Sequence, residues 1–187
     1  MESLRSRMTG ILFQPRATFK EIDGEFTKPG AIWKYILPLA ALGPLAGAIG
    51  RLVFGKRIAL TTLTNPVSVT DAITWGLIAY ALALVSVFVL AQVISLLAPG
   101  FGGQKNDVQA LKVAAYSSTP VWLGGIFTIH ARLIIVSVIV SIYGLYLLYV
   151  GLPILMKVPQ DRAMGYIAVV IIAAIVIFLI VTAFTTF

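Results

Sequence analysis

The chain has 187 residues, of which 59% are hydrophobic and 11% are charged, and its formal net charge is +7. Soluble domains carry about 25% charged residues, so this composition excludes a water-soluble fold. The sequence contains no cysteine and a single histidine, His130, which excludes disulfides and thiolate metal sites. We expect no catalytic residue, metal or cofactor, because the few acidic residues fall in the N-terminal segment, at helix caps or in loops.

Residues 1–30 are predicted to form a cytoplasmic amphipathic segment of one or two short helices. Apolar residues recur there at helical spacing, as in Met8, Ile11 and Leu12, and such a helix has two interpretations. It could lie on the membrane surface with its basic residues toward the lipid headgroups, or pack as a lid over the ends of the spans. The first interpretation assigns four residues to the lipid surface: Arg5, Arg7, Arg16 and Lys20.

Residues 31–187 contain five long apolar stretches with no acidic residue inside them. About 20 apolar residues in a helix cross the hydrocarbon core of a bilayer, and each stretch is at least that long. The predicted fold class is therefore all-α, an integral membrane bundle of five transmembrane helices after the N-terminal segment. The predicted spans are about 31–54, 72–98, 108–129, 133–156 and 163–187.

The basic residues predict the orientation of these spans. With the N-terminus in the cytoplasm, ten of the 14 lysines and arginines lie on the cytoplasmic side and four lie on the other side. Positively charged loops stay inside, which predicts a cytoplasmic N-terminus and an external C-terminus. The same residues can contact anionic lipids. We expect membrane lipids as partners and no nucleic acid, because the chain lacks an interleaved aromatic and basic surface.

The first predicted span is rich in small residues. Gly43 and Gly47 form a GxxxG motif, and Gly50 continues the small-residue spacing one step around the helix. Small residues let a second helix approach closely, so these three glycines are predicted to pack against other spans, with a homo-oligomeric contact as the alternative. Pro44 removes a backbone donor and is predicted to kink this span.

Polar residues and prolines interrupt the next three spans. A helix broken by proline can build a binding cavity, although a static packing kink is the more frequent outcome. Tyrosines and an amide inside a span can contact a solute or bond to a neighbouring helix. The candidates for a cavity or a helix break are Pro44, Gln92, Tyr116, Ser117, Pro120, Tyr143, Tyr146 and Pro153.

Several segments of the chain follow a pattern known from one family. They are Lys112-Val-Ala-Ala-Tyr-Ser-Ser-Thr-Pro120, Tyr143-Gly-Leu-Tyr-Leu-Leu-Tyr-Val-Gly-Leu-Pro153, the stretch from Met156 to Tyr166, and Phe13-Gln-Pro15 with Phe19-Lys-Glu-Ile22. Together they resemble the bacterial branch of the Yip1 family, whose members have five spans. The resemblance implies an N-cytosolic bundle in the bacterial inner membrane. Eukaryotic members are associated with membrane traffic and Rab-type GTPases, but their Asp-Leu-Tyr-Gly-Pro tract is not found here, so GTPase binding is not carried over.

Two functions agree with these features. The first is a non-enzymatic scaffold or adaptor that acts through lipids, a protein partner or a second copy of the chain. The alternative is a channel or transporter for a small solute or ion that uses proline-broken helices. A wet cavity between the kinks of the first and third spans, containing Tyr116 and Gln92, would favour transport. A dry, closely packed bundle would favour the adaptor.

Overall fold

The computed structural model describes residues 4–57 and 64–186. Nearly all of them are helical, so the predicted all-α class is confirmed. The helices are α1 (Leu4–Phe13), α2 (Pro15–Gly24), α3 (Pro29–Ala40), α4 (Leu42–Phe54), α5 (Val69–Leu97), η1 (Ala98–Phe101), α6 (Asp107–Ser117), α7 (Thr119–Gly124), η2 (Gly125–Ile129), η3 (Ala131–Leu133), α8 (Ile134–Met156) and α9 (Gln160–Thr186). Two short strands, β1 (Lys56–Arg57) and β2 (Thr64–Asn65), pair antiparallel between α4 and α5.

Four helical stretches among the described residues are long and apolar enough to cross a membrane. They are Pro29–Phe54, Val69–Phe101, Ile134–Met156 and Gln160–Thr185, and they show an integral membrane protein. The predicted third span, 108–129, is not a single helix, because it divides at Ser118 into α6, α7 and η2. Pro120 lies two residues after this break and has no backbone donor, which disfavours a continuous helix. A count of five spans stays a prediction.

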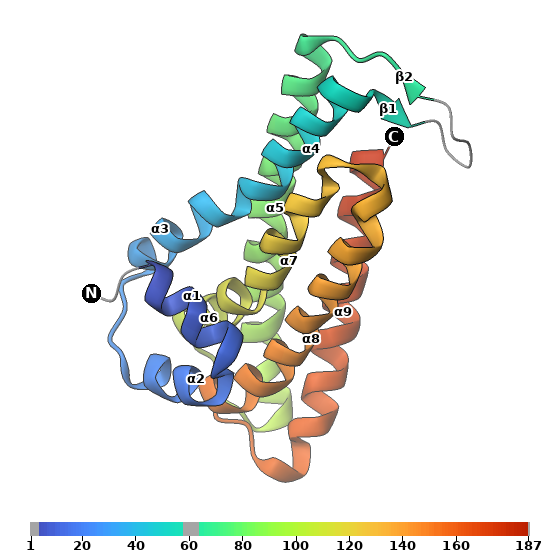
Figure 1. Cartoon of the computed structure of the whole chain (residues 1–187). Coiled ribbons are helices and arrows are strands. Elements are labelled where there is room, and N and C mark those ends of the chain that lie inside the picture. The colour runs from blue at the N-terminus through green and yellow to red at the C-terminus, as the bar shows by residue number, and fades with distance from the viewer. Residues whose placement is uncertain (1–3, 58–63, 187) are drawn as a thin grey trace.

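The broken segment forms the centre of the bundle. Figure 1 shows α5, α8 and α9 running alongside one another, and α6 packs against both α5 and α8. Every residue of α6 from Ala110 to Ser117 is buried. A helix enclosed by protein can satisfy polar side chains through its neighbours, unlike a helix that faces lipid. This enclosure explains how α6 carries Lys112, whose side chain is 2% exposed.

The first span bends as its proline predicts. α3 ends at Ala40 and α4 begins at Leu42, and Pro44 cannot donate to the carbonyl of Ala40. The small residues of α4 lie at close approaches. A Cβ atom added to Gly43 would lie 3.3 Å from the Cα of Gly125, and one added to Gly50 would lie 2.2 Å from the carbonyl oxygen of Ile129. The backbones of α4 and η2 are therefore in direct contact.

The end of α9 is fixed by side chains from α4 and α5. The last carbonyls of a helix lack partners within the helix. Here the carbonyl of Thr185 accepts a hydrogen bond of 2.8 Å from Trp75 Nε1 and one of 3.0 Å from Arg51 Nη2. The Arg51 guanidinium also lies 4.0 Å from the centre of the Trp75 ring, a cation–π contact. Gly47 makes room for this ring, since a Cβ atom there would lie 2.5 Å from Trp75 Cη2.

Replacing Trp75 by phenylalanine is expected to lower the free energy of unfolding by about 1 kcal/mol, because the hydrogen bond to Thr185 is lost while most of the ring contact stays. Thermal unfolding in detergent measures the change. Trp33→Phe is the matched control, since the Trp33 indole makes no hydrogen bond with the residues described. Equal decreases of the unfolding temperature in the two variants would contradict a stabilising role for the hydrogen bond from Trp75 to Thr185.

Candidate functional site: an N-terminal cap held by a polar cluster

Helices α1 and α2, residues 4–24, form the N-terminal cap, which packs on the bundle. Pro15 occupies the first position of α2, where its missing donor costs nothing. Phe19 and Ile22, about one turn apart on α2, are both fully buried. The Phe19 ring fills the space over Gly151 of α8, where a Cβ atom would lie 2.8 Å from Phe19 Cζ. Of the two interpretations of this segment, the structure supports the packed lid.

A tyrosine of α8 also bonds to the cap. The hydroxyl of Tyr143 donates to the carbonyl of Leu12 at 2.8 Å. The Tyr143 and Tyr146 rings lie 5.4 Å apart, and Tyr146 is 43% exposed. Neither tyrosine lines the cavity that lies among helices α5 to α9. These predicted cavity residues therefore lie at the cap and on the outer surface of α8.

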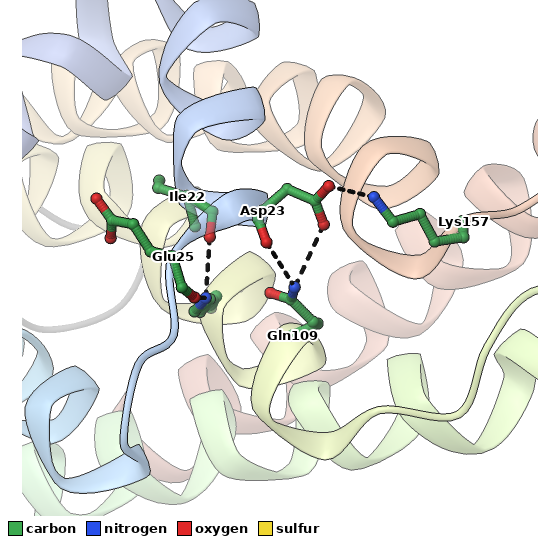
Figure 2. Close-up of polar contacts among 6 residues, drawn as sticks. Ile22, Asp23, Glu25, Gln109 and Lys157 are labelled. Carbon is green, nitrogen blue, oxygen red and sulfur yellow. Dashed lines mark hydrogen bonds and ion pairs between the residues drawn. The ribbon is translucent and has the colours of Figure 1, made fainter.

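The polar cluster comprises Asp23, Glu25, Gln109, Lys112 and Lys157. Its most buried member is Lys112 on α6, whose Nζ donates to the carbonyls of Ile22 at 2.9 Å and Glu25 at 2.8 Å. Figure 2 shows the two carbonyls, which lie at the C-terminal end of α2. A cation is favourable there because the helix dipole is negative at that end. The two bonds offset the cost of burying the charge.

Asp23 connects α2 to two other parts of the bundle. Its carbonyl and its carboxylate each accept a hydrogen bond of 3.3 Å from Gln109 Nε2 of α6. Its other carboxylate oxygen pairs with Lys157 (Figure 2). Lys157 follows α8 in the left-handed conformation, with φ of 54°, at the turn into α9. The cluster thus ties α2 to α6 and to the α8–α9 turn.

One residue predicted at the lipid surface is found elsewhere. Arg7 is 8% exposed, and its Nη2 donates to Glu25 Oε1 at 2.6 Å. Arg7 is buried because α1 packs against α2 and the Arg7 side chain pairs with Glu25, which directly follows α2. The other three predicted surface residues, Arg5, Arg16 and Lys20, are exposed.

Helix α3 faces the break between α6 and α7 across packed side chains. Tyr35 of α3 and Thr119 of α7 share a hydrogen bond of 2.7 Å between their hydroxyls. The Tyr35 ring lies 4.9 Å from the ring of Tyr116 and 6.5 Å from that of Trp122, centre to centre. All three aromatic side chains are buried. Pro120, beside Thr119, belongs to this packed region.

The remaining candidates are not brought to one site. Gln92 is half-buried on α5 and does not line the cavity among helices α5 to α9. Ser117 does line that cavity. Pro153 lies inside α8 without ending it. A cavity containing both Tyr116 and Gln92, which would favour transport, is therefore not found in the described part of the chain.

Sequence reasoning missed the polar cluster. The sequence treats Lys112 and Lys157 only as two of the ten basic residues on the cytoplasmic side that set the orientation, and it gives Asp23 and Gln109 no role. The available signal is a lysine inside a predicted span, because a charged group there needs a partner. That signal identifies Lys112 but not its partners, which are two backbone carbonyls about 90 residues earlier in the chain.

Comparison with known families agrees with this architecture. The Yip1 domain matches residues 9–182, which include most of the cap, the polar cluster and all of the bundle except the last residues of α9. The chain belongs to the Yip1 family. No curated protein and no solved structure matches the chain. The resemblance seen in the sequence is thus confirmed for the Yip1 family, while the bacterial branch stays a prediction. In this Yip1 protein a single match thus covers most of the cap together with most of the bundle.

Proposed function

We propose that this Yip1 protein is a non-enzymatic membrane adaptor whose N-terminal cap contacts anionic lipid headgroups. The observation that carries the proposal is the contrast between the two faces of the cap. Its inner face is held to the bundle by buried apolar residues and by the polar cluster. Its outer face exposes three basic residues, Arg5, Arg16 and Lys20. A surface held rigidly beside a membrane can contact lipids with little loss of conformational freedom.

Two phenylalanines strengthen the case for a lipid contact. Phe13, at the end of α1, is 80% exposed, and Phe26, just after α2, is 95% exposed. Phe26 precedes the membrane-spanning stretch that begins at Pro29, so it lies close to the bilayer boundary. Exposed aromatic side chains flanked by basic residues are typical of segments that bind the headgroup region. Glu21 is also exposed on α2 and reduces the positive charge of this surface.

The packing of α3 against the break between α6 and α7 supports the adaptor over a transporter. The rings of Tyr35, Tyr116 and Trp122 are buried against one another there, where a conduit would need water. Solute and ion flux across liposomes that contain the purified protein tests the choice. We expect no flux above that of protein-free liposomes, and reproducible flux that requires the folded protein would overturn the proposal.

The lipid contact itself predicts a charge-dependent signal from the cap. Because the chain has no cysteine, Ala17→Cys, at an exposed position of α2, can carry a single environment-sensitive dye. In vesicles, we expect its emission to shift to the blue when anionic phosphatidylglycerol is added to phosphatidylcholine. The shift should disappear in Arg16→Glu/Lys20→Glu, since each basic residue near an anionic surface contributes about 1 kcal/mol.

Lys105→Glu is the control for this experiment, because Lys105 is exposed in the loop before α6, outside the cap. It should keep the shift. Salt should weaken the shift in the parent protein, since the screening length falls from about 10 Å at 0.1 M to about 3 Å at 1 M salt. A shift that survives both the charge reversal and high salt would contradict the headgroup contact.

A further inference from the structure

A cavity of about 290 Å³ lies inside the bundle, away from the polar cluster. Side chains from α5, α6, α7, α8 and α9 line it. Its inner wall includes three buried apolar residues, Val87 and Leu90 of α5 and Trp122 of α7. Its volume is near the lower end of the range for ligand pockets in proteins, about 300–1,000 Å³. The cavity is thus large enough for part of one elongated apolar molecule.

The cavity opens between two membrane-spanning helices. At its edge, Val138 and Ile142 of α8 are 48% and 58% exposed, and Ile175 and Phe178 of α9 are 41% and 48% exposed. Exposed apolar side chains on membrane-spanning helices face the hydrocarbon of the bilayer. The mouth of the cavity therefore opens to lipid tails.

The polar groups of the cavity are poorly arranged for water or ions. Ser86, Ser118 and Ser141 line it, and each hydroxyl already donates to a carbonyl three or four residues earlier in the chain at 2.7–2.8 Å. The hydroxyl of Ser117 is buried and has no hydrogen-bond partner among the described residues. A buried water needs two to four polar partners, and the rest of the lining is apolar. An empty cavity would instead leave its walls without dispersion contacts.

We propose that this cavity holds an acyl chain of a bilayer phospholipid, which enters between α8 and α9. A hydrocarbon chain matches the lining, reaches the mouth directly from the membrane, and restores the contacts that an empty cavity would lose. The site uses none of the residues of the cap, so it is independent of the proposed headgroup contact and would remain if that contact failed.

Trp122 provides the test, because it lines the cavity and is 5% exposed. In the full chain carrying Trp33→Phe and Trp75→Phe it is the sole tryptophan, since the sequence contains three. We reconstitute this protein in phosphatidylcholine vesicles whose acyl chains carry bromine at mid-chain, which quenches tryptophan emission on contact. We expect strong quenching of Trp122.

Ala174→Phe fills the cavity from α9 and should abolish most of this quenching. Ala168→Phe is the matched control, because Ala168 is exposed on the same helix and does not line the cavity. Equal quenching in the two variants would overturn the proposal, as would a Trp122 that brominated phospholipid does not quench. Quenching by a free brominated fatty acid but not by the phospholipid would also overturn it.

Folding is checked by thermal unfolding of each variant in detergent. If the tryptophan replacements prevent folding, the comparison of Ala174→Phe with Ala168→Phe in the otherwise native chain answers the same question, because neither Trp33 nor Trp75 lines the cavity. If Ala174→Phe does not fold, Ala174→Leu is used with Ala168→Leu and is read in the same way.

Discussion

Replacing Lys112 by methionine is expected to lower the free energy of unfolding by about 2–3 kcal/mol, because two buried carbonyls lose a charged donor. Methionine keeps a flexible apolar stem of similar length, so the change isolates the ammonium group. The carbonyls of Ile22 and Glu25 accept from this group at 2.9 and 2.8 Å. With both bonds lost, the C-terminal end of α2 should detach more readily from α6.

Two measurements check this result. Denaturant unfolding in detergent reports the global change, and hydrogen exchange of the α2 amides reports detachment of the cap. Lys105→Met is the control, since Lys105 is exposed. Its free energy of unfolding should stay within about 0.5 kcal/mol of the parent value. If Lys112→Met leaves both the unfolding free energy and the exchange of α2 unchanged, the lysine does not hold the cap.

Gly50→Ala is expected to cost about 2 kcal/mol, a value within the range for overpacking at a closely packed contact. The added Cβ atom would lie 2.2 Å from the carbonyl oxygen of Ile129. That oxygen belongs to the backbone of η2, so it cannot move aside as a flexible side chain could. α4 and η2 must separate, and the contact between the first span and the broken segment must loosen.

Gly30→Ala is the matched control for this prediction. Gly30 is also helical, but nothing lies within 4 Å of a Cβ atom added there. Alanine favours a helix over glycine by about 1 kcal/mol, so this variant should be as stable as the parent or more stable. Thermal unfolding of the two variants in the same detergent gives the comparison. If Gly50→Ala unfolds at the same temperature as Gly30→Ala, α4 does not pack closely on η2.

Much of the candidate site could not be predicted from the sequence, and the reason differs between residues. The pattern of the N-terminal segment predicts its helices, yet the same pattern fits a helix on lipid or a helix on protein. Arg7 shows the consequence, since a basic residue has the same local pattern whether it faces headgroups or Glu25. Lys112 is similar, because its partners lie in α2 and only the packing of α2 on α6 brings them together.

The sequence by itself determined the membrane class, the all-helical architecture, the family and a helix break close to Pro120. These follow from properties of single segments, namely their length, their apolar composition and a proline that cannot donate a hydrogen bond. Only the tertiary structure decided that α6 lies buried at the centre, that the cap is held by a buried lysine, and that a cavity opens between α8 and α9. Each of these depends on contacts between segments distant in the chain, which no local pattern specifies.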